Sequence, residues 1–298
     1  MAWRTLFIAT PTKLSVKNSQ LCIIQEETVT VPLEDISVII LECPQINMSV
    51  ATLSLLLEAR IVLYTCDNKH LPNGVLLPFN VHSRQTKMNQ VHMGLTEPFK
   101  KRSWQQVVTR KIQNQAKCLE LLECKGTDYL IKLSHNVLSG DSDNREGVAA
   151  KYYFAQLFGK FTRLDETPLN AALDYGYAIM RGAVARSIVS YGFIPCLGIF
   201  HRSEVNQFNL ADDFMEVLRP VIDLWAAQHM IDQHELTKEY RARLVNLLHH
   251  DIKIRDENQT VLHAIQVMLS SFSSACQSGD FKKLQLPELI PLQLHSYE

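Results

Sequence analysis

Short apolar and alternating runs fill about the first eighty residues of the chain and predict β-strands. The runs are rich in Ile, Val and Thr, the residue types that suit a pleated sheet. They occupy residues 6–9, 21–24, 29–33, 38–41 and 61–64. Turn-forming residues separate them, and one helix is expected at 50–60. Five or more short strands in succession predict a small β-sandwich.

Beyond about residue 90 the apolar positions recur every three or four residues, which predicts amphipathic helices. Thr167 and Pro168 form a typical helix start, and Gly192 is a suitable stop for that helix. Asn209 is expected to cap a later helix in which Pro220 introduces a kink. The other expected helices cover residues 104–122, 236–248 and 261–276.

The two patterns together predict an α+β protein with two domains. A small N-terminal β-sandwich domain is expected at residues 1–85, and a larger all-α C-terminal domain at 99–298. Polar residues and Pro98 interrupt the pattern between them, so residues 86–98 are expected to form a linker. A chain of 298 residues buries a sizeable core without disulfides.

Composition narrows the classes of function only slightly. The chain is 46 % hydrophobic and 20 % charged, with a formal net charge of −1, which excludes a disordered protein and a bulk polycation but not a local basic patch. Seven cysteines without a C-x-x-C pair argue against a disulfide framework and a zinc ribbon. The sequence shows no secretory leader and no apolar stretch near the roughly 20 residues of a membrane span. A reducing, cytoplasmic location is therefore expected.

Familiar catalytic motifs are missing from the sequence. It contains no phosphate-binding loop, dinucleotide fingerprint, H-E-x-x-H or G-x-S-x-G motif, so nothing supports a nucleotide cofactor. Cys196 and His201 are close in sequence, but Cys196 lies in an apolar run. A buried structural thiol is therefore favoured over a thiol–imidazole pair.

Two groups of acidic residues stand out in the second half of the chain. Asp213 and Glu216 share a face of the expected helix, so they either bind a cation or are acids that favour the helix dipole. Asp143 and Glu146 approximate a capping box, which gives Glu146 a structural alternative. His201 is in the same way either a structural residue or a ligand.

Glu146, His201 and Glu216 together form a set of two carboxylates and one imidazole that suits Mg²⁺ or Mn²⁺. The imidazole favours Mn²⁺, because Mg²⁺ prefers oxygen ligands. The three residues come from separate segments that no local motif covers. The pattern of residue types by itself therefore leaves the metal site and the structural alternatives open.

Longer motifs follow one another in order around these residues. They read N-R-E-G at 144–147, A-K-Y-Y-F at 150–154, N-A-A-L-D-Y-G-Y-A at 170–178, L-G-I-F-H at 197–201 and F-N-L-A-D-D-F-M-E at 208–216. This ordered set resembles the integrase subunit of the CRISPR adaptation machinery, the larger of its two near-universal proteins. Trp3-Arg4-Thr5 and Lys13-Leu14-Ser15 make the chain most similar to the type II branch. The resemblance covers essentially the whole chain.

The resemblance implies a metal-dependent DNA integrase or endonuclease of CRISPR adaptive immunity. Such an enzyme inserts short duplex DNA, the new spacers, into the CRISPR array by transesterification with a 3′-hydroxyl. Motif matching assigns the catalytic and metal-ligating roles to Glu146, His201 and Glu216, with Mn²⁺ or Mg²⁺ as cofactor. Asp213 and Asn170 are expected to be auxiliary, although Asn170 fits a helix cap equally well. The alternative is a catalytically silent DNA-binding scaffold of the adaptation complex.

The resemblance also implies partners. The family forms homodimers, so the N-terminal domain is expected to dimerise. Two such dimers flank a dimer of a smaller, ferredoxin-like adaptation subunit, and in the type II branch the RNA-guided effector nuclease assists spacer choice. The expected DNA partners are the spacer precursor and the CRISPR repeat, and no membrane partner is expected.

Basic residues supply candidate DNA contacts. They gather in a stretch without Asp or Glu, at Lys100, Lys101, Arg102, Arg110, Lys111 and Lys117. Arg145 and Arg219 flank the ligand positions and are candidates for phosphate contacts. A solvated helix face and structural ion pairs remain the alternatives.

Overall fold

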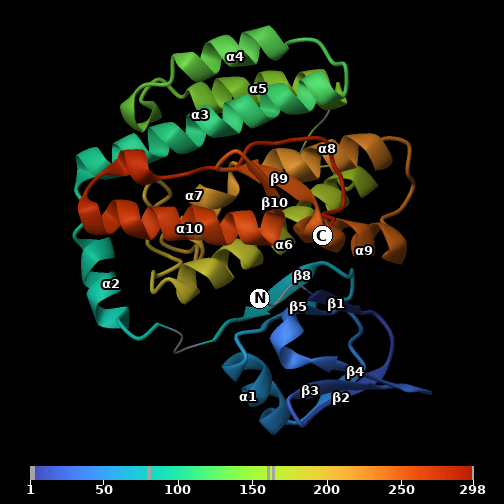
Figure 1. Ribbon diagram of the computed structural model, residues 1–298. Helices are drawn as coiled ribbons and strands as arrows, with labels where there is room; N and C mark the ends of the chain where they lie inside the picture. The colour runs from blue at the N-terminus through green and yellow to red at the C-terminus, as the bar shows by residue number, and fades with distance from the viewer. Residues whose placement is uncertain (1–3, 79–81, 160–161, 163–164, 297–298) are drawn as a thin grey trace.

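A computed structural model describes residues 4–78, 82–159, 162 and 165–296 of the chain. A β-rich N-terminal part precedes a helical C-terminal part, which confirms the predicted α+β fold class (Figure 1). Trp3, one of the residues that carry the resemblance, lies outside the described residues. None of the described helices combines the length and the apolar character that crossing a membrane requires.

The N-terminal part contains two four-stranded sheets. One sheet has the order β1 (Arg4–Ile8), β5 (Ile36–Leu41), β7 (Val62–Cys66) and β8 (Pro72–Leu76). The other has the order β4 (Thr28–Pro32), β3 (Gln20–Ile24), β2 (Thr12–Lys17) and β6 (Ile46–Met48). The helix α1 (Val50–Glu58) begins at Ser49, whose hydroxyl accepts a hydrogen bond from the Thr52 amide. The expected helix at 50–60 is thereby confirmed.

The first of these sheets is buried on both faces. Along β5, Val38 and Ile40 belong to the core of the helical part, whereas Ile39 between them belongs to the core between the two sheets. In β7, Tyr64 likewise belongs to the core of the helical part and Leu63 to the core between the two sheets. Because successive side chains of a strand point to opposite faces, the continuous apolar run of β5 serves two cores at once. Parallel pairing of β1 with β5 and of β5 with β7 is consistent with this burial.

Nine helices are described in the C-terminal part. They are α2 (Gln85–Met93), α3 (Glu97–Leu121), α4 (Thr127–His135), α5 (Arg145–Phe158), α6 (Pro168–Ser190), α7 (Asn209–Met215), α8 (Arg219–His229), α9 (Lys238–Asn246) and α10 (Val261–Ser278). Short 3₁₀ turns lie at Leu33–Asp35, Ser139–Asp141, Leu247–His249 and Phe281–Lys283. Thr167 caps α6 and Pro168 occupies its first turn, as predicted.

The observed helix boundaries differ from the expected ones at two prolines, Pro98 and Pro220. Residues 86–98, expected to be a linker, hold most of α2 and the start of α3, where Pro98 occupies the first turn. The expected helix from Asn209 is divided into α7 and α8, and Pro220 lies in the first turn of α8. The predicted cap at Asn209 is wrong, because this residue is already helical. Its side-chain amide donates instead to the carbonyls of Cys196 and Ser203.

A two-stranded hairpin, unforeseen from the sequence, interrupts the helical part. Its strands are β9 (Asp251–Ile254) and β10 (Glu257–Thr260), paired antiparallel. Arg255 and Asp256 connect them, both with positive φ, as a two-residue hairpin turn requires. Since β10 is polar throughout, it gives no hydrophobic alternation by which it could be predicted.

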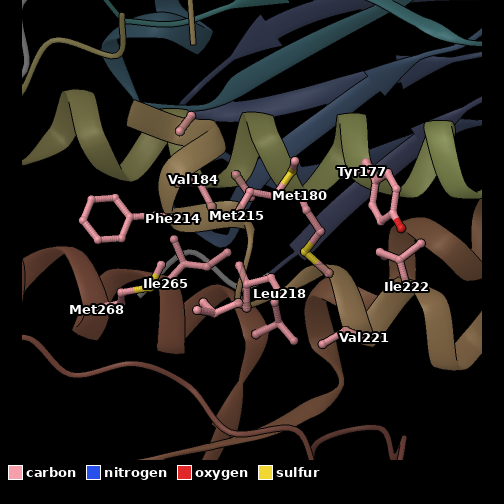
Figure 2. Packing of buried hydrophobic residues seen from close by; sticks show 14 of the residues in the cluster. Tyr177, Met180, Val184, Phe214, Met215, Leu218, Val221, Ile222, Ile265 and Met268 are labelled. Atoms are coloured by element: carbon pink, nitrogen blue, oxygen red, sulfur yellow. The ribbon is translucent and has the colours of Figure 1, made fainter. Parts of the chain in front are cut away.

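The core of the helical part lies around α6, which packs against α7, α8 and α10 (Figure 2). Met180 of α6, Phe214 of α7, Ile222 of α8 and Ile265 of α10 belong to this one cluster of buried side chains. The chain between α7 and α8, which carries Glu216, is therefore anchored by buried helices on both sides.

Tyr64 joins the two parts of the protein at one close contact. Its hydroxyl donates a hydrogen bond to the carbonyl of Ile179, 2.9 Å away on α6. A Cβ atom at Gly182, one turn further along α6, would lie only 1.7 Å from the Tyr64 hydroxyl oxygen. The absence of a side chain at Gly182 therefore lets the sheet approach the helix.

We expect Gly182→Ala to destabilise the protein, because the added methyl group meets the buried ring of Tyr64, whose hydroxyl is held by the Ile179 carbonyl. Overpacking of this kind costs about 1–3 kcal/mol. The measurement is urea unfolding of the full chain, with Lys151→Ala on the exposed face of α5 as the control. Equal unfolding midpoints for Gly182→Ala and the control would contradict the contact.

Stability should also depend on pH through His92, which is only 3 % exposed and whose Nδ1 has no hydrogen-bond partner among the described residues. Burial lowers the pKa of His92 to about 4. The unfolded chain, with a histidine pKa of about 6.5, then binds more protons than the folded chain between these values. Stability is complete above about pH 6.5 and falls as the pH drops toward 4, by up to about 3 kcal/mol.

His92→Phe, which keeps a ring against Phe193, should reduce this loss in thermal melts taken from pH 7 to pH 4.5. His135→Phe at an exposed position is the control. An unchanged pH slope in His92→Phe would show that His92 does not titrate in the unfolding transition.

Candidate active site

Glu146 is placed by the backbone bonds that begin α5. Asn144 adopts a left-handed conformation (φ 54°) and caps the helix. The Asp141 carboxylate accepts hydrogen bonds from the Arg145 and Glu146 amides at 2.8 and 3.0 Å. The predicted capping role of Asp143 is therefore wrong, since Asn144 and Asp141 satisfy the amides at this end of the helix. The Glu146 side chain is thus free to turn toward α3.

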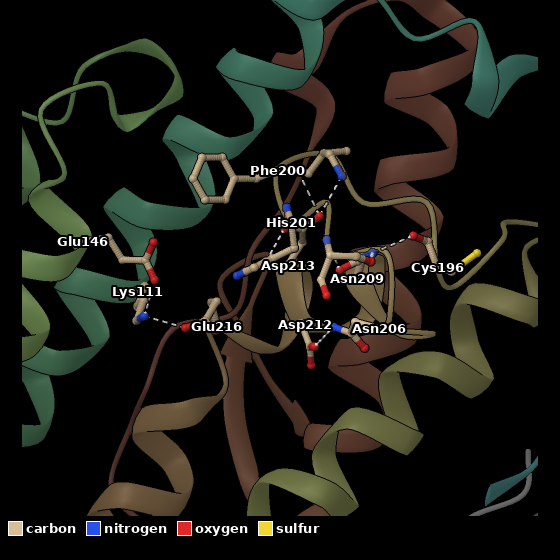
Figure 3. Close-up of polar contacts among 12 residues, drawn as sticks. Lys111, Glu146, Cys196, Phe200, His201, Asn206, Asn209, Asp212, Asp213 and Glu216 are labelled. Carbon is tan, nitrogen blue, oxygen red and sulfur yellow. Dashed lines mark hydrogen bonds and ion pairs between the residues drawn. The ribbon is translucent and has the colours of Figure 1, made fainter. Parts of the chain in front are cut away.

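Lys111 lies between the two carboxylates that the sequence singles out (Figure 3). Its ammonium is 2.7 Å from Glu146 Oε1 and 2.5 Å from Glu216 Oε2. Lys111 and Glu216 are only 6 % and 4 % exposed. The expected place of Lys111 on an exposed basic rim is therefore wrong, because α5 and the chain after α7 cover this part of α3.

Charge is closely balanced around Glu216. Arg219 donates to Glu216 Oε1 at 2.8 Å and lies over the ring of Tyr177, 4.5 Å from its centre. Burial by itself raises the pKa of Glu216, but the charges of Lys111 and Arg219 outweigh burial and lower that pKa to about 2. Burial likewise opposes the charge on Lys111, and the two carboxylates raise its pKa in spite of burial.

His201 is held by Asp213, which is fully buried. The His201 Nδ1 atom lies 2.7 Å from Asp213 Oδ1, and the same carboxylate accepts the amides of Ile199, Phe200 and His201 (Figure 3). With Nδ1 engaged, Nε2 is the ring nitrogen left to bind a metal ion. The hydrogen bond to Asp213 raises the pKa of His201, burial opposes the rise, and the negative charges of Asp213, Glu216 and Glu146 add to it.

Close packing fixes the loop before His201. A Cβ at Gly198 would lie 2.3 Å from the His201 carbonyl oxygen and 2.8 Å from Asp213 Oδ2, so only glycine permits this turn around the carboxylate. Phe200 stacks in parallel on Trp104, with ring centres 4.2 Å apart. Both rings also meet the His201 ring edge to face. The imidazole is therefore held by packing as well as by its hydrogen bond.

The three residues predicted to bind the metal ion, Glu146, His201 and Glu216, lie on neighbouring segments, but their side chains are not close enough together to coordinate one ion. Among the described residues, no three His, Cys, Asp or Glu side chains are close enough to hold a metal ion as they stand. The donor set nevertheless fits a divalent cation. Glu216 Oε2 is buried and, apart from its ion pair with Lys111, receives no hydrogen bond of good geometry in the described part of the chain. Two carboxylates and one oriented imidazole are suitable ligands for Mn²⁺ or Mg²⁺.

A further buried carboxylate lies behind Arg219 and was not anticipated from the sequence. Asp223 accepts hydrogen bonds from the hydroxyls of Tyr177 and Tyr153, and burial raises its pKa to about 6. The Arg219 guanidinium lies over the ring of Tyr177, and the Tyr177 hydroxyl donates to Asp223. Asp223 therefore helps to hold the ring on which Arg219 packs. The sequence did contain a signal for this buried carboxylate, because Asp223 lies among the apolar residues of α8.

A cleft of about 540 Å³ opens beside His201, between the start of α3 and the loop after α6. Polar and charged side chains dominate its wall. They include His92, Lys100, His201, Arg202 and Asn209. Cys196 also lines the cleft and is exposed, so the buried thiol predicted from the apolar run is wrong. His201 thus borders an open, polar space.

Most of the other predicted basic residues are paired with acids. Lys100 contacts Glu97, Arg110 contacts Glu288, Lys117 contacts Glu120 and Arg145 contacts Asp143. Lys101 and Arg102 are exposed, and Arg102 lies over the ring of Phe281. The basic stretch therefore forms a surface of mixed charge.

Asn170 has a structural position in the first turn of α6. Its side-chain amide donates to the carbonyls of Thr162 and Asp165, both at 2.8 Å. Its own backbone amide donates to the capping hydroxyl of Thr167. These bonds organise the chain before α6, but the cap of α6 is Thr167, so the capping role considered for Asn170 is wrong.

Comparison with known proteins identifies the family. The chain matches the description "CRISPR associated protein Cas1" over residues 6–251. The CRISPR-associated endonuclease Cas1 of Neisseria meningitidis serogroup C (strain 8013) is 44 % identical over 308 residues, covering all of both chains. The protein belongs to the Cas1 family.

Solved structures share the fold. A casposase bound to integration product superposes with a TM-score of 0.75 at 16 % identity, covering 100 % of this chain and 97 % of the casposase. A chain of a Cas6-RT-Cas1–Cas2 complex gives a TM-score of 0.72 at 20 % identity, covering 95 % of this chain but 36 % of that longer one. The arrangement of a β-rich part followed by a helical part is therefore shared beyond close relatives.

We expect Asp213→Asn to release the loop that carries His201. Both carboxylate oxygens accept hydrogen bonds, whereas the amide would present its NH₂ group to backbone donors. Such an unsatisfied buried contact costs about 1–3 kcal/mol. Hydrogen exchange of the amides at Ile199, Phe200 and His201 should speed up, with Asp232→Asn on the surface as the control. Unchanged protection of these amides would contradict the role given to Asp213.

Proposed function

We propose that this protein is a metal-dependent DNA integrase that inserts short duplex DNA into a CRISPR array. The 3′-hydroxyl of the incoming DNA attacks a phosphodiester at the repeat boundary, and one phosphodiester is exchanged for another. No nucleotide hydrolysis is needed, which is consistent with the missing phosphate-binding loop. Family membership and the endonuclease name of its relative from Neisseria support phosphodiester chemistry.

The observation that carries this proposal is the convergence of Glu146 and Glu216 on one point. The two carboxylates come from separate helical segments and lie within 2.7 Å of the same buried ammonium, while their charges also act on His201. Carboxylates that gather in this way, here one buried and one partly exposed, require a cation between them. Glu146, Glu216 and His201 Nε2 would hold Mn²⁺ or Mg²⁺ here. A bound divalent cation supplies polarisation of the phosphodiester and stabilises charge on the attacking or leaving oxygen.

The remaining residues position these groups. Asp213 would accept a hydrogen bond from the Nδ1–H of neutral His201, which leaves Nε2 as the unprotonated ring nitrogen. Arg219, held by Glu216 and Tyr177, fixes the orientation of the Glu216 carboxylate. Lys101, Arg102 and Arg145, at or near the surface, are the described basic residues that we assign to DNA phosphates.

We infer the partners from the same family. The fold shared with a chain of a Cas6-RT-Cas1–Cas2 complex supports a Cas2-like adaptation subunit as the partner, and the casposase bound to integration product supports duplex DNA as the substrate. Homodimerisation through the N-terminal part, assistance by a type II effector nuclease and a cytoplasmic location belong to this proposal as well.

A strand-transfer assay tests the proposed function. The full chain is mixed with its adaptation partner, Mn²⁺ or Mg²⁺, a labelled duplex with free 3′-hydroxyls and a plasmid carrying a leader and repeat. We expect the wild type to join label to the plasmid, and Glu216→Gln and His201→Ala to lose at least about 100-fold of this activity. Glu257→Gln, at an exposed position of the β9–β10 hairpin, is the matched control and should keep activity.

Two other outcomes would change the proposal. Nicking of the plasmid or degradation of the duplex without joining would indicate a nuclease that uses water as the nucleophile at the same site. DNA binding without chemistry in the wild type would indicate a scaffold, and the assignment of Glu146, His201 and Glu216 as ligands would then be wrong.

A further inference from the structure

Lys111 occupies the place that the proposed function requires for a metal ion. Its ammonium contacts one oxygen of Glu146 and one oxygen of Glu216, the two carboxylates assigned to the cation. The side chain is buried, and it originates in the middle of the long helix α3 (Figure 3). An ammonium and a divalent cation are both bound by carboxylate oxygens, so they compete for the same ligands.

The two cations are not compatible at this point. Like charges at ligand distance repel strongly in a buried site, where screening by water is weak. A divalent cation bound by both carboxylates therefore forces the Lys111 ammonium away from at least one of them. Arg219 remains on the other oxygen of Glu216, Oε1, and does not stand in the way.

We propose that Lys111 is an internal counter-cation, which neutralises Glu146 and Glu216 in the metal-free protein and must be displaced when a divalent cation binds. This inference rests on the proposed function, because it concerns regulation of the same site. In the metal-free protein Lys111 keeps the buried carboxylate of Glu216 and the partly buried carboxylate of Glu146 stable next to each other. Its displacement costs free energy, so any divalent cation binds more weakly than it would without a resident ammonium.

The backbone around Lys111 is fixed, so the displacement is a movement of the side chain. The Asn114 amide donates to the carbonyls of Val217 and Pro287, and its oxygen accepts the amide of Leu289. These buried bonds tie α3 to the chain directly after Glu216 and to the C-terminal segment. The four-carbon side chain of lysine is flexible, so the ammonium can move by rotation about its side-chain bonds while the backbone stays in place.

Gln115 offers a second partner for the released ammonium. Its Oε1 atom is buried and accepts no hydrogen bond from any described residue. Gln115, which carries this side-chain amide, lies one turn after Lys111 on the same face of α3. The carbonyl oxygen of this amide satisfies an ammonium without competing for the metal ion.

Manganese binding to the purified full chain tests the inference without measuring activity. Free Mn²⁺ is followed by electron paramagnetic resonance at neutral pH, in wild type, Lys111→Met, Lys111→Arg, Lys117→Met and Glu216→Gln. Lys117→Met is the matched control, because it removes a lysine of the same helix that pairs with Glu120 instead. Thermal unfolding of each variant is measured with and without Mn²⁺.

We expect Lys111→Met to bind Mn²⁺ at least about tenfold more tightly than wild type, because no resident cation has to leave. Without metal its melting temperature should fall, since the buried Glu216 and the partly buried Glu146 then share too little positive charge, and Mn²⁺ should raise its melting temperature more than that of wild type. Lys111→Arg keeps the charge and should bind no more tightly than wild type. It also keeps the test decisive if Lys111→Met does not fold.

Other results would overturn one proposal or the other. Mn²⁺ binding by Lys111→Met that equals or is weaker than that of wild type and Lys117→Met would exclude the counter-cation role, as would tighter binding by Lys111→Arg. If neither wild type nor Lys111→Met binds Mn²⁺, the metal site is wrong, and the proposed function falls with it. The same conclusion follows if Glu216→Gln binds Mn²⁺ as tightly as wild type does.

Discussion

The close approach of one buried and one partly buried carboxylate is the constraint on which the site depends. Glu146 and Glu216 lie so close that they need positive charge between them, and α3 supplies it from Lys111 while Arg219 supplies it from the other side. This requirement fixes the distance of α5 and of the α7–α8 corner from α3 (Figure 3). The same carboxylates can be neutralised in two ways, by the Lys111 ammonium or, as we propose, by a divalent cation that replaces it.

Much of the fold follows from local sequence patterns. The run at 38–41 and the helix from Pro168 were predicted correctly, because apolar spacing and a capping hydroxyl act over a few residues. Pro98 and Pro220 were predicted to interrupt the pattern or kink a helix, yet both lie in the first turn of a helix, where proline is also favoured. The strand β10 was missed because its polar residues are held by tertiary pairing and have no alternation of their own.

The site was less accessible to such reasoning. Glu146, His201 and Glu216 are far apart in sequence, so their residue types suggested a metal set but left the structural alternatives open, and only the resemblance favoured the metal site. The position of Lys111 depends on the packing of distant segments, although the sequence does place it on the apolar stripe of α3, three and seven residues after Val108 and Trp104. A lysine on such a stripe requires an acidic partner, and that signal was available. The bond between His201 and Asp213 was not, because it depends on the turn at Gly198.

The sheet that contains β5 has a consequence for handling the protein in pieces. Val38, Ile40, Val62 and Tyr64 belong to the core of the helical part, and they are covered only while that part is attached. A fragment that ends near residue 85 would expose them as one continuous apolar strip, and such strips are covered by association with other copies. Oligomers of the isolated fragment would therefore report on this uncovered strip rather than on how intact chains associate.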